Sequence, residues 1–234
     1  MDNKIWNEKC IIEPSLICLD MLHLEKQVRL LEANNIKALH VDILDGYFSP
    51  CMPLGFETIR QLRKITDLAF DCHVMARSPE YFVGELLDIG VEQITFHIET
   101  ALHADRLLKD IQSHNVRAGI ALNPTTSLEE LDYIIENCHE ILVMQINPGY
   151  ASRNNEQRVV YADRKIQAVK KLIDERGLQT KIAIDGRVSE NQIRDYGNKV
   201  VDVFVVGTTC INKKNISESI AKMMEIRDEI IRLG

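Results

Sequence analysis

The strongest constraint on the fold of this chain is an alternation of apolar, β-rich runs with helix-periodic runs that continues along its whole length. The β-rich runs cover residues 11–19, 38–44, 69–75, 93–99, 117–123, 140–147, 181–186 and 201–207. Amphipathic runs follow them at 21–35, 56–65, 79–90, 101–115, 126–137, 161–177, 189–198 and 217–233. Apolar residues every three to four positions predict helix, and short, nearly continuous apolar runs are typical of buried parallel strands. The sequence therefore predicts eight β/α units.

Eight such units in 234 residues fit one closed (β/α)₈ barrel, because such barrels typically contain about 250 residues. We expect a single domain over residues 1–234. An open doubly wound sheet would carry a glycine-rich phosphate-binding motif after its first strand, and the sequence contains neither G-x-G-x-x-G nor a P-loop. In a barrel the reactive groups lie at the carboxyl ends of the strands, so the polar residues there are the candidates for a functional site.

Composition excludes several kinds of partner. The formal net charge of −7 disfavours nucleic acid, and no apolar run approaches the ~20 residues that span a bilayer. The first ten residues lack the apolar segment of a signal peptide, so a cytoplasmic location is expected. The six cysteines show no framework spacing and are expected to be reduced.

A histidine-carboxylate set lies at the predicted strand ends. His40 and Asp42 are two residues apart and so share one face of the second strand, His73 ends the third strand, and Asp185 ends the seventh. Two histidines and two carboxylates suit one divalent ion such as Zn²⁺, Fe²⁺, Mn²⁺ or Co²⁺. The alternative is a hydrogen-bonded core network that holds no ion.

A pair of carboxylates at such a centre predicts proton transfer. A metal ion polarises a substrate carbonyl, after which one aspartate can remove a proton from the adjacent carbon while the other returns one to the opposite face. His97, at the end of the fourth strand, is expected to be a hydrogen-bonded core residue. Asp45, which precedes Gly46, is a candidate cap for the turn after the second strand.

The loops after the seventh and eighth strands, 185–189 and 206–210, predict an anion site, because barrels often bind phosphate there on backbone N–H groups. Arg187, Thr208 and Thr209 offer donors, and Arg153 in the 147–153 loop could add a charge-assisted hydrogen bond.

Eight segments in the right order carry a resemblance to a known family. They are EPSLICLD (13–20), HVDILDGYFSP (40–50), DCHVM (71–75), FHIE (96–99), LNPTT (122–126), VMQINPG (143–149), AIDG (183–186) and VFVVGTT (203–209). With these segments the chain resembles the ribulose-phosphate 3-epimerases from about residue 11 to about residue 212.

The resemblance implies a metal-dependent, ribulose-phosphate-binding (β/α)₈ barrel that acts as a 3-epimerase of a phosphorylated ketose, of the D-ribulose 5-phosphate to D-xylulose 5-phosphate type, and is a homo-oligomer. On the matching positions, Asp42 and Asp185 would be the acid/base pair, working through a metal-bound enediolate. The implied ligands of the one divalent ion are His40, Asp42, His73 and Asp185. The implied substrate contacts are Ser15, His73, Asn147, Gly149, Asp185, Gly186, Arg187, Gly207 and Thr208, and Met75 and Met144 would line the site.

The chain departs from the family pattern on the substrate side. The usual DGG after the seventh strand is DGR, which places Arg187 where a glycine is usual, and the usual NPGFGGQ is NPGYASR. The segments SLICLD, DCHVM and VGTT resemble the D-allulose-6-phosphate 3-epimerase branch more closely than the pentose-phosphate enzymes. Both substrates therefore stay open at this point.

Two further interpretations are weighed against the epimerase. Barrel decarboxylases and aldolases of the orotidine-phosphate decarboxylase and hexulose-phosphate synthase type rely on D-x-K-x-x-D, whereas Asp42 is followed by Ile43, Leu44 and Asp45, with no lysine. A sugar-phosphate-binding barrel without turnover is the other alternative, and the presence of both Asp42 and Asp185 disfavours it.

Overall fold

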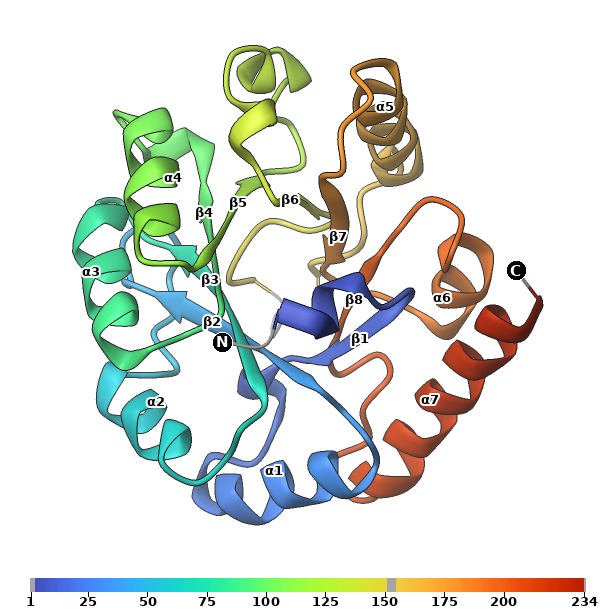
Figure 1. Ribbon diagram of the computed structural model, residues 1–234. Helices are drawn as coiled ribbons and strands as arrows, with labels where there is room; N and C mark the ends of the chain where they lie inside the picture. Colours follow the sequence, from blue (N-terminus) through green and yellow to red (C-terminus); the bar gives the residue numbers. More distant parts are fainter. Residues whose placement is uncertain (1–2, 151–154, 234) are drawn as a thin grey trace.

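The computed structural model describes residues 3–150 and 155–233. Its eight strands run parallel in the order β1-β8-β7-β6-β5-β4-β3-β2, and a bridge between Ser15 and His40 joins the two outer strands. Figure 1 shows the resulting barrel along its axis. The strands are β1 (Ile11–Pro14), β2 (Ala38–Leu44), β3 (Ala69–Met75), β4 (Gln93–His97), β5 (Arg117–Leu122), β6 (Glu140–Met144), β7 (Lys181–Asp185) and β8 (Val203–Val206). The predicted (β/α)₈ barrel is confirmed.

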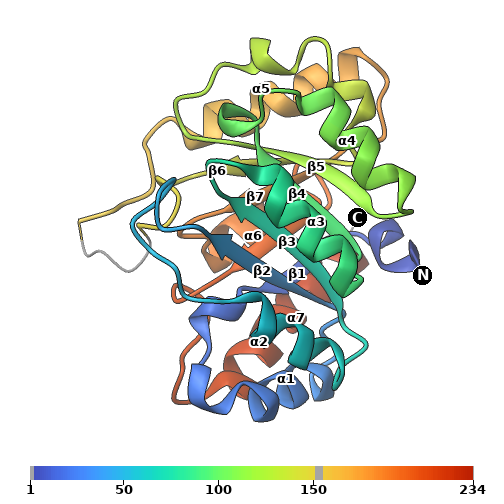
Figure 2. The same ribbon diagram turned by 90° about the vertical axis from the view of Figure 1, so that its left-hand side faces the viewer.

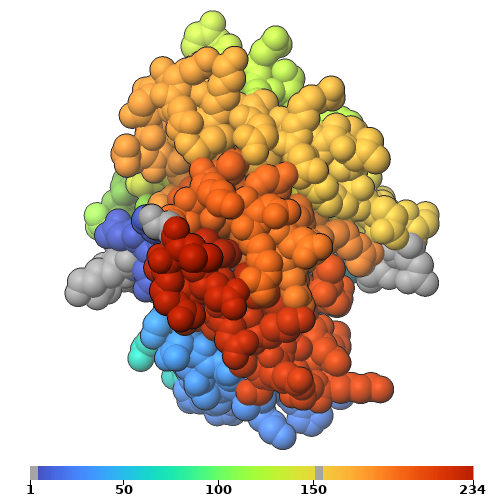
Figure 3. Space-filling model, turned by 90° about the vertical axis from the view of Figure 1, so that its right-hand side faces the viewer, coloured from blue at the N-terminus to red at the C-terminus, as the bar shows by residue number. Residues whose placement is uncertain are grey.

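Helices surround the strands, each burying one apolar face against the sheet. In α4, for example, Leu107, Leu108 and Ile111 recur at helical spacing and are buried. The helices are α1 (Leu24–Ala33), α2 (Phe56–Arg63), α3 (Pro79–Ile89), α4 (Ala104–Ser113), α5 (Ala162–Glu175), α6 (Glu190–Tyr196) and α7 (Ile216–Leu233). Figure 3 shows α5, α6 and α7 covering one side of the molecule. Among the described residues, no helix is both long and apolar enough to cross a membrane.

The predicted helix over 126–137 is wrong. Two short 3₁₀ helices stand there, Leu128–Leu131 and Ile135–Asn137. In an α-helix the Asp132 carbonyl would accept a hydrogen bond from residue 136, but here it accepts one from Arg176 at 2.8 Å. The Arg176 guanidinium also binds the Asp132 and Glu136 carboxylates, at 2.8 and 2.9 Å. A tertiary contact thus replaces the helical hydrogen bond that the apolar spacing predicted.

The first predicted strand, 11–19, is also shorter than expected. It ends at Pro14, and a 3₁₀ helix at Leu16–Cys18 follows, with the Cys18 N–H donating to the Ser15 carbonyl at 3.1 Å. This turn carries the chain over the carboxyl end of the barrel.

The two ends of the barrel differ. Figure 2 shows the N-terminal segment at one end and the loops that follow β2 and β6 at the other. The N-terminal 3₁₀ helix, Asn3–Asn7, brings Trp6 to a buried position, and the Arg117 guanidinium lies 5.1 Å from the centre of its ring. Since this segment occupies the amino end of the strands, the carboxyl end is where a substrate has access.

Candidate active site and metal centre

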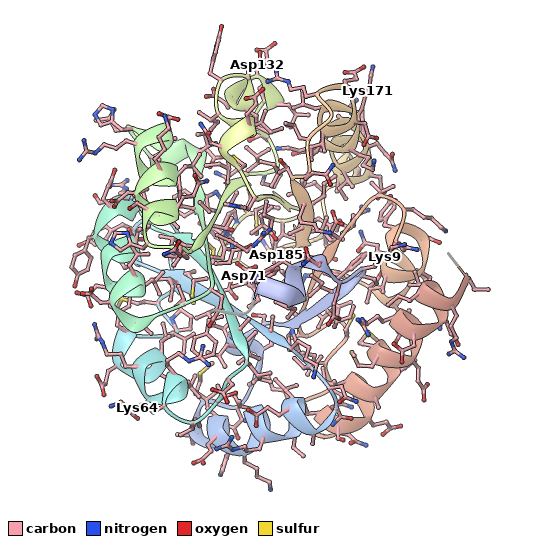
Figure 4. The ribbon with its side chains drawn as sticks, viewed as in Figure 1. Lys9, Lys64, Asp71, Asp132, Lys171 and Asp185 are labelled. Atoms are coloured by element: carbon pink, nitrogen blue, oxygen red, sulfur yellow. The ribbon has the colours of Figure 1, made fainter. Side chains whose placement is uncertain are left out.

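The structure brings together the four residues proposed as metal ligands. Each of His40, Asp42, His73 and Asp185 offers one ligand atom, and these atoms lie within 4.8 Å of one another. The Asp42 Oδ1 atom is 3.4 Å from His40 Nε2 and 3.5 Å from His73 Nδ1, and Asp185 Oδ2 is 3.9 Å from His73 Nδ1. Asp185 lies close to the barrel axis in Figure 4. This convergence follows from the barrel, because β2, β3 and β7 all end at one face.

The nitrogens that face this centre are buried without a hydrogen-bond partner. Both imidazoles are fully buried, and neither His40 Nε2 nor His73 Nδ1 has a partner among the described residues. Buried polar atoms in native proteins are nearly always paired, so two orphaned nitrogens beside two carboxylates need a ligand. A divalent cation satisfies both nitrogens and both negative charges, so the donor set fits a metal ion.

The two carboxyl groups have opposite pKa shifts in the metal-free site. Burial raises the pKa of Asp42, but the electrostatic attraction of the neighbouring His40 ring outweighs burial and holds that pKa well below its ordinary value. Burial, together with the negative charge of Asp42, raises the pKa of Asp185. Carboxyl groups whose pKa values are pushed apart are typical of acid/base pairs.

A cavity opens at Asp42 and Asp185, two of the four proposed ligands. The predicted residues that line it are Ser15, Asp42, Met75, Met144, Gly149, Asp185, Gly186, Arg187, Gly207, Thr208 and Thr209. The sequence analysis did not predict the other lining residues as site residues; they are Ile17, Cys18, Leu44, Cys51, Pro53, Ile146 and Val205. Its polar lining includes Asp42, Asp185 and the loops after β7 and β8, and most of the other lining residues are apolar.

The turn after β7 explains why a glycine would suit position 187. Gly186 has φ +95° and Arg187 has φ +57°, so both lie in the left-handed region that favours glycine. The Arg187 guanidinium donates from Nε and Nη2 to the Glu156 carbonyl, at 3.2 and 3.1 Å. Arg187 therefore accepts backbone strain and joins the β7 turn to the segment that begins at residue 155.

Asn147 lies outside the cavity. Its backbone N–H and its side-chain Nδ2 both donate to Glu156 Oε1, at 2.8 and 2.9 Å. Its contact with substrate stays a prediction. Arg153 falls outside the described residues.

Three polar residues near the site have clear partners. The Ser15 hydroxyl donates to Asp42 Oδ2 at 2.8 Å. Asp45 caps its turn as predicted, because its Oδ1 accepts from the backbone N–H groups of Tyr47 and Phe48, both at 2.7 Å. His97 is the predicted hydrogen-bonded core histidine, with its Nε2 atom 2.9 Å from His73 Nε2.

The sequence analysis missed two buried carboxylates beneath the site. His40 Nδ1 lies 3.5 Å from Asp71 Oδ2 and 3.8 Å from Glu13 Oε2, and both acids are buried. Figure 4 shows Asp71 directed toward the centre of the barrel. The sequence does carry a signal for them, because residues two apart on a strand face the same side. Asp71 precedes His73 by two residues, and Glu13 precedes Ser15 by two. A carboxylate behind a histidine orients the ring toward a metal ion.

The fold and the donor set together define a barrel enzyme with a cluster that could bind a metal ion at the carboxyl ends of its strands. Residues 11–211 match the family model described as the ribulose-phosphate 3 epimerase family, and the chain belongs to that family. It is therefore an epimerase, an enzyme of the isomerase class, and its substrate is a phosphorylated sugar.

Relatives support this assignment along nearly the whole chain. The chain is 32% identical over 197 residues to the ribulose-phosphate 3-epimerase of Treponema pallidum (strain Nichols), which covers 84% of this chain and 89% of the relative. It is 30% identical over 217 residues to the ribulose-phosphate 3-epimerase of Synechocystis sp., which covers 92% of this chain and 93% of the relative.

Solved structures of other barrels share the fold. The 3-keto-L-gulonate-6-phosphate decarboxylase from Vibrio cholerae superimposes with a TM-score of 0.70 at 10% identity, covering 95% of this chain and 99% of the other. KGPDC from Streptococcus mutans gives a TM-score of 0.68 at 14% identity, with coverage of 95% and 99%. At these identities the likeness shows the barrel alone.

Proposed function

We propose that this protein interconverts D-ribulose 5-phosphate and D-xylulose 5-phosphate by inverting C3 with the help of one divalent metal ion. The observation that carries the proposal is the arrangement of Asp42 and Asp185 in one cluster with His40 and His73, with both aspartates lining a cavity that a substrate can enter. The names of the relatives support the choice of a pentose phosphate.

His40, Asp42, His73 and Asp185 would hold the ion. When bound, it supplies positive charge that polarises the ketose carbonyl and so acidifies the proton at C3. Nitrogen and carboxylate ligands suit Zn²⁺, Fe²⁺, Mn²⁺ and Co²⁺, and the proposal covers all four.

The two aspartates would carry the protons. One carboxylate takes the proton from C3 on one face and leaves that carbon planar, and the other delivers a proton to the opposite face, so the configuration inverts without net loss or gain of protons. The Ser15 hydroxyl, 2.8 Å from Asp42 Oδ2, would stabilise the ionised form of Asp42 and hold it in place. Met75 and Met144, which line the cavity, would keep the reacting carbon away from water.

The phosphate would lie at the side of the cavity formed by the loops after β7 and β8. Gly186, Gly207 and Thr208 line that side, where the backbone of Gly207 and Thr208 and the Thr208 hydroxyl would face the phosphate, while the Gly186 N–H donates to Asp185 Oδ1 at 2.6 Å. Arg187 lines the same side and would contribute a charge-assisted hydrogen bond.

A second candidate substrate is D-allulose 6-phosphate. Arg187 favours it, because the arginine stands where a short glycine turn is usual and could reach a phosphate that is one carbon further from C3. A barrel that only binds the sugar phosphate is less favoured, since the whole donor set and both proton carriers are in place.

Hydrogen exchange at C3 tests the proposal. The metal-loaded protein would be incubated in D₂O with D-ribulose 5-phosphate and, separately, with D-allulose 6-phosphate, and deuterium at C3 followed by NMR with a chelator-treated control. We expect metal-dependent exchange with the pentose phosphate that is lost in Asp42→Asn and Asp185→Asn. Exchange that persists in either variant would contradict the two-base mechanism, and exchange with only the hexulose phosphate would reassign the substrate.

We also propose that residues 1–234 form one domain, that the protein is cytoplasmic and that it assembles as a homo-oligomer. The continuous β/α alternation supports the first, and the family resemblance supports the last.

A further inference from the structure

Behind the candidate metal centre, a chain of hydrogen bonds runs from His73 to a carboxylate. His73 Nε2 lies 2.9 Å from His97 Nε2, and His97 Nδ1 lies 3.0 Å from Glu99 Oε2. Both imidazoles are fully buried, and Glu99 is mostly buried at 23% side-chain exposure. Neither His97 nor Glu99 is among the four proposed metal ligands.

The donor and acceptor roles along these hydrogen bonds determine which nitrogen of His73 carries the hydrogen. The carboxylate of Glu99 only accepts, so the His97 Nδ1 atom that faces it must bear a hydrogen. Two ring nitrogens 2.9 Å apart share a single hydrogen. A neutral His97 with its hydrogen on Nδ1 has a lone pair on Nε2, so the shared hydrogen belongs to His73 Nε2.

The charge states of these groups agree with this assignment. Burial raises the pKa of Glu99, but hydrogen bonds from His97, the Thr126 hydroxyl and the Asn123 N–H outweigh it and bring the pKa to about 2, so Glu99 is ionised. Burying a charged group is costly, and both imidazoles are fully buried, so both rings are assigned as neutral.

The position of this hydrogen decides which nitrogen of His73 is available to the metal centre. With its hydrogen on Nε2, His73 has its lone pair on Nδ1, the nitrogen that faces Asp42 Oδ1 at 3.5 Å and Asp185 Oδ2 at 3.9 Å. His40 is arranged the opposite way, with Nε2 toward Asp42 and Nδ1 toward Asp71. The two histidines thus offer different nitrogens to one centre, because different groups stand behind them.

Glu99 itself is held from the other side. Its Oε1 atom accepts from the Asn123 backbone N–H at 2.7 Å and from the Thr126 hydroxyl, while Oε2 alone faces His97. The Lys165 ammonium donates to the carbonyls of Asn123 and Thr126, at 2.5 and 2.8 Å, and so fixes the loop that carries these donors. The carboxylate therefore has a defined orientation, with one oxygen for the loop and one for the histidine.

We propose that Glu99 is a positioning residue that, through His97, holds His73 in the Nε2–H tautomer and turns the unprotonated Nδ1 toward the metal centre. This inference rests on the proposed function for its metal ion, but the tautomer is a property of the metal-free protein as well.

Replacement of Glu99 by glutamine provides a sharp test. The Asn123 N–H and the Thr126 hydroxyl would hold the amide oxygen, so the amide NH₂ would face His97 Nδ1 as a donor. His97 would then carry its hydrogen on Nε2 and donate to His73, which would be left with its hydrogen on Nδ1. One isosteric change is thus expected to reverse two tautomers.

Two readouts follow the effect without substrate. Long-range proton–nitrogen NMR spectra of the imidazole rings in the metal-free protein report the tautomer of His73, with its signals assigned by their loss in His73→Gln. Competition with a chelator reports the affinity for Zn²⁺. We expect Glu99→Gln to move the His73 hydrogen from Nε2 to Nδ1 and to weaken Zn²⁺ binding by about 10- to 100-fold, as is common for groups behind a metal ligand.

Thr126→Val is the matched control, because it removes a hydrogen bond to Glu99 and leaves the Glu99–His97–His73 chain intact. It is expected to keep the wild-type tautomer and to change Zn²⁺ affinity by less than about fivefold. A wild-type His73 that carries its hydrogen on Nδ1, or a Glu99→Gln protein with the wild-type tautomer and affinity, would overturn the proposal. If the epimerase assignment were wrong, exchange at C3 would be absent. The NMR spectra and the Zn²⁺ competition do not depend on that exchange, so the two failures can be told apart.

Discussion

Removal of the Ser15 hydroxyl is expected to lower the rate of epimerisation rather than to weaken substrate binding. The hydroxyl is buried and donates to Asp42 Oδ2 at 2.8 Å. The His40 Nε2 and His73 Nδ1 atoms lie 3.4 and 3.5 Å from the other oxygen, Oδ1. In Ser15→Ala the Oδ2 atom therefore loses its short, charge-assisted hydrogen bond.

The magnitude follows from the kind of hydrogen bond. Hydrogen bonds to charged groups contribute about 1.5–3 kcal/mol. One factor of ten in rate corresponds to about 1.4 kcal/mol, so the loss predicts a kcat about 10- to 150-fold lower. The effect falls on kcat because Asp42 is proposed to act on the bound substrate.

Steady-state kinetics with D-ribulose 5-phosphate, at saturating metal ion, measures the effect. Ser127→Ala is the control, because it too removes a serine hydroxyl, but one at a surface turn, where it accepts from the Glu129 N–H at 3.3 Å. It should change kcat by less than about twofold. A folded Ser15→Ala protein with wild-type kcat and a raised KM would show that Ser15 contacts substrate only, and the reasoning would be refuted.

Three further changes have expected outcomes. Gly186→Ala should lower the free energy of unfolding by about 2–4 kcal/mol in urea titrations, because φ is +95° and a Cβ atom would lie 2.6 Å from a neighbouring side chain. The control Gly177→Ala has φ +64° but open space around the new Cβ atom, so it should lower that free energy by only about 1–2 kcal/mol. Equal losses in the two variants would show that the steric clash at Gly186 contributes nothing. Arg187→Gly relieves a strained φ of +57° and should raise KM for the ketose phosphate about tenfold or more with little change in stability; an unchanged KM for every ketose phosphate would remove Arg187 from the site. Burial raises the pKa of Glu140 from 4.5 to about 8, so the folded protein binds this proton more tightly than the unfolded chain does. The stability that this proton contributes is therefore fully present below pH 4.5 and is lost as the pH rises through about 8. Thermal unfolding of Glu140→Gln should therefore show a smaller loss of stability than wild type between about pH 5 and about pH 8, and parallel pH profiles would contradict the shift.

The local pattern of the sequence was enough to predict the barrel and the ends of its strands. Apolar periodicity reports which face of a segment is buried, and eight β/α units have few ways to pack other than a closed barrel. The convergence of the four proposed ligands was predictable for the same reason, since polar residues at the ends of buried parallel strands must meet at one face. The segment 126–137 shows the limit, because Arg176, some forty residues away, withdraws the Asp132 carbonyl from the helix that the pattern favoured.

Only the tertiary structure decided how the candidate site is held. The sequence shows a histidine at positions 40 and 73, but the nitrogen that each offers depends on what lies behind the ring: Asp71 behind His40, and His97 with Glu99 behind His73. Similarly, Arg187 was identifiable as a departure from the family pattern, yet its positive φ and its hydrogen bonds to the Glu156 carbonyl required the folded loops. Periodicity is a property of neighbouring residues, whereas tautomers, pKa shifts and strained turns arise from groups that only the closed barrel brings within hydrogen-bonding distance.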